Sequence, residues 1–465
     1  MNMINVRRLT VMTFLGAGML SGISAQVSPL QVDTLKETKI PDQWDLQSCI
    51  DYAKEQNITI RKNRITAAST QIDVKTAKAA MFPSLSFSTS QQVVNRPYQE
   101  TSSRVSGNEI ISSNSKTSYN GNYGLNASWT LYNGNKRLKT IQQEKLNNQM
   151  AELDVATSEN NIQESIAQVY IQILYAAESV KVNENTLQVS IAQRDRGQEL
   201  LNAGSIAKSD LAQLEAQVST DRYQLVTAQA TLEDYKLQLK QLLELDGENE
   251  MNIYLPALSD ENVLAPLPTK KDVYISALSL RPEIEASKLN VEASELGIGI
   301  AKSSYLPTIS LSAGIGTNHT SGSDFTFGEQ VKNGWNNSIG LSVSVPIFNN
   351  RQTKSAVQKA KLQYETSMLS LLDEQKTLYK TIEGLWLDAN SAQQRYAAAN
   401  EKLKSTQISY ELISEQFNLG MKNTVELLTE KNNLLQAQQE QLQAKYMAIL
   451  NTQLLKFYQG DQLAI

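Results

Sequence analysis

The side chains that most often carry protein chemistry are scarce in this sequence. Cys49 is the only cysteine and His319 the only histidine among the 465 residues. One thiol cannot form a disulfide framework or a thiol-based metal site, and one imidazole rules out a multi-histidine metal site. Carboxylates are plentiful, but no glycine-rich phosphate loop or nucleophile motif accompanies them. We therefore expect a protein that is not an enzyme and that carries no cofactor and no metal.

The N-terminal segment, over 1–25, has the layout of a secretory signal peptide. Arg7 and Arg8 precede the apolar run LTVMTFLGAGML, and Ala25 offers a small residue for cleavage. Cleavage there removes two arginines, so the net charge of -5 becomes 41 − 48 = −7. An acidic chain lacks the basic face that nucleic-acid binding requires, so we expect no nucleic-acid partner. No later segment approaches eighteen consecutive apolar residues, and we expect no membrane-spanning helix.

Long segments without proline predict very long helices. No proline occurs between Pro97 and Pro256, or after Pro346, and proline disrupts helix interiors. Apolar residues recur in steps of four and three at Ile162, Ile166, Val169, Ile173, Ala176 and Val180. This heptad seam is typical of helices that pack side by side. A helix over 135–201 would be roughly 100 Å long, and similar segments predict helices over 351–418 and 424–458.

Four other segments alternate apolar residues with Ser, Asn, Thr and Gly. A period of two predicts strands with one apolar and one polar face. These strands are expected at about 84–94, 119–131, 308–320 and 336–348. Their length suits outer-membrane strands of roughly 9–11 residues. Taken alone, the strands fit a soluble sheet that lies on a helix equally well.

The pattern of predicted strands and helices occurs twice along the chain, as an internal repeat. Pro83 and Pro307 each mark a helix-to-strand junction, and Gly204 and Gly420 each mark a helix break. The two prolines are further apart in the sequence than the two glycines are. The segment from the junction proline to the break glycine is therefore longer in the first copy than in the second. The extra residues fall in the loop between the paired strands of the first copy.

The repeat defines the domains that the sequence predicts. They are a signal peptide over 1–25, a first repeat over 45–246, a linker over 247–268 and a second repeat over 269–460.

Four one-sided strands cannot stand alone in a bilayer. Open sheet edges would leave N–H and C=O groups unsatisfied in hydrocarbon, and closed membrane barrels begin at about eight strands. A membrane-spanning form must therefore be an oligomer in which the strands close a shared barrel. The long amphipathic helices would then close a shared tube.

With these features the sequence resembles the TolC-like outer-membrane efflux protein family over about 45–458. The resemblance rests on the duplicated A-K-x-x-x-x-P junction, the strand exits WTLYNGNK and VPIFNNRQ, and the helix breaks NAGSIAKSDL and NLGMKNTVEL. It implies a fold that is mainly α with membrane β. Each of three identical chains would give four strands to one twelve-stranded outer-membrane β-barrel, and its helices to a periplasmic α-barrel.

The resemblance also implies a function and partners. The homotrimer would sit in the outer-membrane lipid of a Gram-negative bacterium, with its helices projecting into the periplasm. It would pass small molecules, such as drugs and toxic compounds, outward from an inner-membrane efflux pump by way of a periplasmic adaptor protein.

A periplasmic gate is the third implication of the resemblance. Lys422 matches the family's basic latch residue, Asp210 its acidic partner, and Glu426 the first member of an acidic ring. Phe417 stands where the family has a tyrosine that helps hold the latch. Thr429 stands where a second ring carboxylate would be. From these two departures we expect a gate that is held more weakly or by other contacts, and a lower cation preference.

The glycines at the two helix breaks have a structural interpretation. Glycine accepts the positive φ that ends a helix and reverses the chain. Gly204 and Gly420 would therefore turn the chain at the periplasmic tips, over 202–210 and 418–426. The same tips are the expected docking surface for the adaptor.

Two other functions stay open from the sequence. The same channel could serve type I protein secretion, because the pump and the adaptor choose the cargo. A periplasmic coiled-coil tether would explain the long helices, but it explains neither the one-sided strands nor the repeat.

Overall fold

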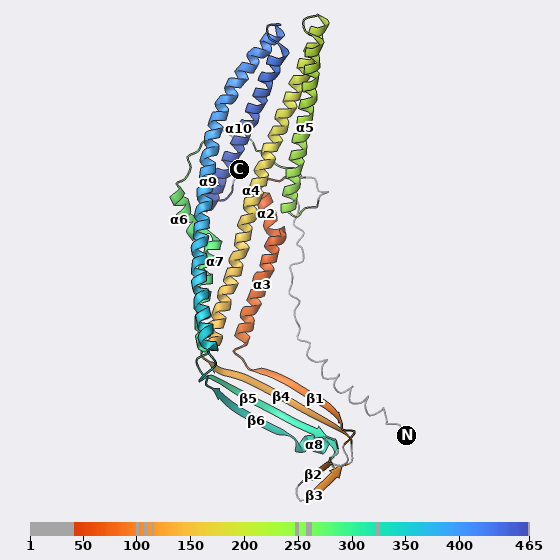
Figure 1. Cartoon of the computed structure of the whole chain (residues 1–465), viewed down its shortest axis with the longest axis vertical. Coiled ribbons are helices and arrows are strands. Elements are labelled where there is room, and N and C mark those ends of the chain that lie inside the picture. The colour runs from red at the N-terminus through yellow and green to blue at the C-terminus, as the bar shows by residue number, and fades with distance from the viewer. Residues whose placement is uncertain are drawn as a thin grey trace, which may run out of the picture. The chain divides into compact units, whose positions relative to one another are not determined.

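The computed structural model describes residues 41–98, 102–106, 109–113, 116–246, 251–256, 263–321, 323 and 325–463. The predicted signal peptide and parts of the predicted linker lie outside the described residues. From Gln43 onward the chain forms one unit, with long helices at one end and a sheet at the other (Figure 1).

The elements of the chain occur in two matching sets. The first set is α2 (Leu46–Gln56), α3 (Ile58–Ala79), β1 (Ser84–Asn95), β4 (Thr117–Asn133), α4 (Lys136–Asn202) and α5 (Lys208–Leu242). The second set is α6 (Lys270–Leu280), α7 (Pro282–Ser303), β5 (Thr308–Thr320), β6 (Asn336–Ser344), α9 (Gln352–Asn418) and α10 (Thr424–Gln459). Equivalent helices match in length: α2 and α6 have 11 residues each, and α3 and α7 have 22 residues each.

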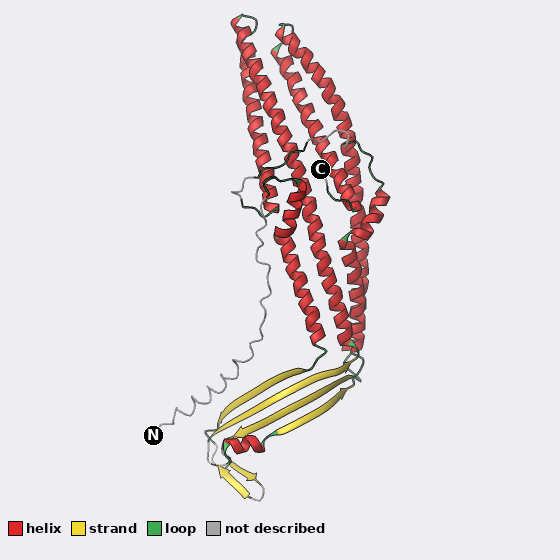
Figure 2. Cartoon of the chain, turned by 180° about the vertical axis from the view of Figure 1, so that it is seen from behind, coloured by secondary structure: helices red, strands yellow, loops and turns green. Residues whose placement is uncertain are grey.

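The two longest helices, α4 and α9, have 67 residues each. At about 1.5 Å per residue each is roughly 100 Å long. α4 packs along α5, and α9 along α10, so that each pair forms a helical hairpin (Figure 2). α10 also packs against α4, which joins the two hairpins within the chain.

The elbows between strand and long helix repeat at the level of backbone conformation. Gly134 and Asn135 have φ of 68° and 63°, and their counterparts Asn350 and Arg351 have 49° and 62°. Two successive left-handed residues redirect the chain from the sheet into the helix. The elbow of the first copy is also held by Ser303, whose hydroxyl donates to the carbonyl of Gly134 at 2.8 Å.

The four main strands form one antiparallel sheet in the order β1-β4-β5-β6. Residues opposite each other share a face, and Phe87, Leu125 and Ile315 follow one another across three strands. Their face carries the apolar residues and is open in the single chain, where Phe87 is 67% exposed and Ile339 is 83% exposed. β1 and β6 are the edges of this sheet.

β6 is shorter than the sequence predicts. It ends at Ser344 and not near 348. Pro346 follows two residues later and has no N–H to donate to a ladder.

Each loop between paired strands contains an element that the sequence analysis did not predict. The longer first loop contains β2 (Ser102–Ser106) and β3 (Glu109–Ser113), which pair as a separate hairpin. The second loop contains the short helix α8 (Phe327–Asn333). Both lie at the end of the sheet that is far from the long helices (Figure 1).

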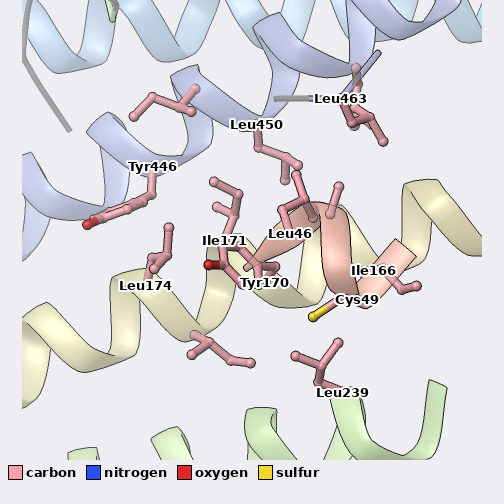
Figure 3. Packing of buried hydrophobic residues seen from close by; sticks show 14 of the residues in the cluster. Leu46, Cys49, Ile166, Tyr170, Ile171, Leu174, Leu239, Tyr446, Leu450 and Leu463 are labelled. Atoms are coloured by element: carbon pink, nitrogen blue, oxygen red, sulfur yellow. The ribbon is translucent and has the colours of Figure 1, made fainter. Parts of the chain in front are cut away.

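The main core lies where α2 packs on the long helices (Figure 3). Cys49 of α2 lies among Ile166 and Tyr170 of α4 and Leu239 of α5. Its side chain is fully buried, and burial raises the pKa of the Cys49 thiol to about 12. The thiol therefore stays protonated at neutral pH and packs as a small apolar group.

A second, smaller core lies where α6 packs on α9 and α10, around Val273, Ile382 and Leu455.

The junctions that precede α3 and α7 show how the two copies differ. Asn57 donates from its side-chain amide to the carbonyl of Leu242 at 3.0 Å. Its counterpart Arg281 is buried, pairs with Glu164 at 2.7 Å and lies 3.7 Å over the ring of Tyr458. The backbone repeats at this junction, while the chemistry that fixes it does not.

Substitution of Gly134 tests the elbow. A Cβ there would lie 2.7 Å from the carbonyl oxygen of Ser303, whereas a Cβ at Gly204 meets nothing within 4 Å. Both glycines have positive φ, which costs an alanine about 1–2 kcal/mol. We expect Gly134→Ala to lower the thermal unfolding midpoint, followed by circular dichroism at 222 nm, more than Gly204→Ala does. Equal losses in the two variants would contradict the close approach at the elbow.

Candidate functional site

The site that the sequence predicts lies at the free ends of the two helical hairpins. Gly204 and Gly420 have φ of +71° and +73°, and each ends the first helix of its hairpin. The residue after each glycine donates its N–H to the carbonyl five residues back, at 2.8 Å and 2.9 Å. This pattern satisfies carbonyls at the helix end and reverses the chain within a few residues.

Both predicted gate carboxylates cap the helix that follows the turn. Asp210 accepts the N–H of Ala207 on Oδ2 at 3.0 Å. Glu426 accepts the N–H of Asn423 on Oε2 at 3.2 Å, and the side chain of Asn423 accepts the N–H of Glu426 at 2.9 Å. A negative charge in the first turn is also favoured by the helix dipole. Each acid therefore has a local structural role in addition to any role in a gate.

Lys422 pairs with Glu426 within its own tip. The distance from Lys422 Nζ to Glu426 Oε1 is 2.5 Å. This hydrogen bond, with the one from the backbone of Asn423, holds the pKa of Glu426 below its usual value. Asp210 belongs to the other hairpin, so the expected Lys422–Asp210 pair does not form inside one chain. The Lys422–Asp210 latch that the resemblance implies stays a prediction.

Two further residues belong to the predicted gate. Phe417 is buried, with only 3% of its surface exposed. Thr429 is exposed, and its hydroxyl donates to the carbonyl of Val425 at 2.8 Å within its own helix.

The structure contains a buried ionic cluster that the sequence analysis missed. Lys431 of α10, Asp221 of α5 and Ser190 of α4 are 3%, 1% and 2% exposed. The Lys431 ammonium donates to both Asp221 Oδ2 and Ser190 Oγ, and Ser190 donates to Asp221 at 2.5 Å. Gln217 donates to the second carboxylate oxygen at 2.9 Å. Every charged group in the cluster is therefore paired, and the cluster joins the two hairpins near their tips.

Burial lowers the pKa of Lys431, and the Asp221 carboxylate opposes that shift. Removing either charge would leave the other without an opposite charge in a site closed to water.

The heptad pattern contained a signal for this cluster. Lys431 stands four residues after Leu427 and three before Leu434, on the seam that buries these leucines. Asp221 stands three residues after Val218, which is also buried. Charges of opposite sign at seam positions of two helices indicate a buried pair, because seam positions face the partner helix.

Neither a metal-binding group of side chains nor a membrane-spanning helix occurs among the described residues. No group of three or more His, Cys, Asp or Glu side chains is arranged to hold a metal ion among the residues that the structure describes. None of the described helices combines the length and the apolar character needed to cross a membrane.

The family model for outer membrane efflux proteins matches residues 49–244 and 273–460, one stretch in each copy. The chain belongs to the outer membrane efflux protein family. Family members are channels, and the relatives named below place this protein in the outer membrane.

Two curated relatives and one solved structure illustrate the similarity. Outer membrane protein TolC of Escherichia coli (strain K12) is 24% identical over 294 residues, which cover 61% of this chain and 58% of TolC. Toxin and drug export protein A of Aggregatibacter actinomycetemcomitans is 21% identical over 428 residues, or 89% of this chain and 87% of that protein. The chain thus spans less than two thirds of TolC.

A crystal structure of CusC superimposes with a TM-score of 0.75 at 19% identity, covering 90% of this chain and 92% of CusC. At this identity the likeness shows the fold.

A double-mutant cycle tests the buried cluster. Lys431→Met or Asp221→Leu alone leaves one buried charge without an opposite charge, which costs about 3–5 kcal/mol. The double variant replaces the pair by apolar side chains and should recover most of that loss. Urea unfolding followed by circular dichroism gives the free energy of unfolding of each variant.

The exposed Lys404 supplies the control, because Lys404→Met should change the free energy of unfolding little. A single Lys431 variant as stable as the Lys404 variant would contradict the buried pair.

Proposed function

We propose that three copies of this chain form a channel that passes small molecules from the periplasm to the outside of the cell. The observation that carries this proposal is the open sheet. One face exposes apolar side chains such as Phe87 and Ile339, and the strand order leaves β1 and β6 as edges. In hydrocarbon those edges need hydrogen-bond partners, and further copies of the sheet supply them.

The number of copies follows from the barrel and from the family. Membrane barrels begin at about eight strands, so two copies would reach the lower limit and three would give twelve. The resemblance to TolC-like channels favours three.

Exposed apolar residues on the helices support the closure of a shared tube. On α5, Tyr223 is 74% exposed and Val226 is 58% exposed; on α9, Ile408 and Leu412 are more than half exposed. Soluble helices seldom leave such seams open, and a neighbouring chain would cover them.

The tips would form the gate of this tube. We place Asp210 of one chain against Lys422 of the next, where Lys422 also holds Glu426 of its own chain. Exposed ion pairs contribute about 0.2–1 kcal/mol each. Three such pairs bias the channel toward a closed state and still allow a partner to open it. The Lys431–Asp221 cluster would keep the two hairpins of each chain together during that motion.

The same tips would dock a periplasmic adaptor that connects the channel to an inner-membrane pump. Three apolar residues at the second tip, Leu419, Met421 and Val425, are 69%, 71% and 58% exposed. Apolar side chains at the end of a long polar helix support contact with another protein. Transport through such a channel needs no catalysis and no cofactor in this chain.

The alternative is that the same channel serves type I protein secretion, with proteins as its cargo. One relative carries the name toxin and drug export protein A. The tether function is not proposed, because the chain belongs to an outer-membrane family of channels.

Single-channel recording in planar bilayers tests the channel and its latch. We expect Asp210→Ala and Lys422→Ala to raise the conductance of the purified protein, because each removes one partner of the inter-chain pair. Lys404→Ala, on an exposed part of α9, should conduct like the wild type. Variants at both latch positions that conduct like the wild type would contradict the latch, and a protein that forms no channels would contradict the proposed function.

The charge of Glu426 predicts how ion selectivity depends on pH. A ring of carboxylates favours cations, so Glu426→Gln should reduce the cation-to-anion permeability ratio. The folded pKa of Glu426 lies below 4.5, so the carboxylate stays ionised until the pH falls through that lower value. We expect the midpoint of the loss of selectivity in the wild type to lie below 4.5, the ordinary pKa of a glutamate. A midpoint above 4.5 would contradict the Lys422–Glu426 pair.

A further inference from the structure

The short helix α8 is fixed to the sheet at the end away from the long helices (Figure 2). Thr317 of β5 donates its hydroxyl to the carbonyl of Val331 at 2.7 Å, and the N–H of Thr320 donates to the side chain of Gln330 at 2.8 Å. The ring of Phe327 meets that of His319 edge to face, with centroids 5.1 Å apart. Strand β5 therefore determines where α8 lies.

The contacts place α8 beside β5, against side chains of the apolar face of the sheet. Side chains two residues apart on a strand share a face, so Thr317 and His319 lie on the face of Ile315. Ile315 stands opposite Leu125 of β4, and His319 stacks on Tyr123 of β4 with centroids 5.9 Å apart. Under the proposed function this is the face that contacts lipid.

α8 occupies space that the short strand β6 leaves free. β6 begins at Asn336, which pairs with Gly316, while β5 continues to Thr320. The last residues of β5 therefore have no strand beside them on this side, and α8 lies there instead.

The helix and its flanks present aromatic side chains outward. Phe325 is 55% exposed, Phe327 is 48% exposed and Trp335 is 57% exposed, and Lys332 stands in the last turn. A soluble loop gains nothing from three exposed aromatic rings. Aromatic and lysine side chains together are the composition of a membrane–water interface.

We propose that α8 is an interfacial helix that lies against the outer leaflet of the membrane, on the lipid side of the barrel's outer rim. Phe325, Phe327 and Trp335 reach the boundary between acyl chains and headgroups. The lipid-facing surface of β4 and β5 continues directly into α8, which is why lipid is the occupant and not a soluble partner. A trimer carries three such helices, and they fix the depth of the barrel in the bilayer.

Spin labels on introduced cysteines test this placement, which rests on the proposed membrane position of the sheet. The full-length protein is reconstituted into phosphatidylcholine vesicles with a label at Phe325→Cys, and a second variant, Trp335→Cys, repeats the measurement. Cys49 is buried and its thiol stays protonated, so the wild type should take up no label. Accessibility to oxygen, which concentrates in lipid, is compared with accessibility to a water-soluble nickel chelate.

Two positions serve as references. Asn122→Cys reports the opposite face of the sheet, on β4 directly across from Asn318, and Leu341→Cys reports the apolar face of β6 nearer the middle of the sheet. We expect an oxygen-to-nickel ratio several-fold higher at 325 and 335 than at 122, and lower than at 341.

A ratio at 325 and 335 equal to that at 122 would show that α8 faces water and would overturn the proposal. Labels shielded from both reagents would show that protein covers α8, which would overturn it as well. If 341 is itself accessible to nickel, the sheet does not face lipid and the proposed function fails first.

Discussion

Hydrogen bonding at the edges of one antiparallel sheet is the constraint on which the rest of the structure depends. β1 and β6 end the sheet, and its apolar face is open in the single chain. Hydrocarbon offers no partner for the N–H and C=O groups of an edge, so an outer-membrane chain of this kind has to close its sheet with other copies of itself. If the strands close into a ring as we propose, the long helices attached to them are expected to close into a tube.

The two copies within the chain share a backbone and differ in the side chains that fix it. Equivalent elbows use Gly134 and Asn350, and equivalent junctions use Asn57 and Arg281. The same divergence appears at the tips, where Lys422 pairs with Glu426 and the first tip has no corresponding ion pair among the described residues.

Much of the fold could be predicted from the sequence, because period and composition report on local structure. The heptad seam that contains Ile166 and Ile173 predicted the long helices, and the segments with a period of two predicted the main strands. Two elements escaped prediction, since the polar loops that form α8 and the β2–β3 hairpin carry neither pattern strongly. The predicted end of β6 near 348 is wrong, because Pro346 has no N–H for the strand ladder and β6 ends before it.

The site was harder to predict than the fold. Spacing places Lys422, Glu426 and Asp210 at helix tips, but it cannot tell which of the two acids the lysine meets. The partner is decided by the turn at Asn423, which brings Glu426 within one helical turn of Lys422. The buried pair of Asp221 and Lys431 was readable only by comparing seam positions on two distant helices, since each charge alone looks like ordinary helix surface.

Native mass spectrometry of the full-length protein, extracted from the outer membrane in detergent, tests the central claim most directly. The account predicts a particle with the mass of three chains, because identical copies satisfy the edges of the sheet and the resemblance to TolC-like channels favours three of them. A particle with the mass of one chain would contradict the account, and so would a particle with the mass of two.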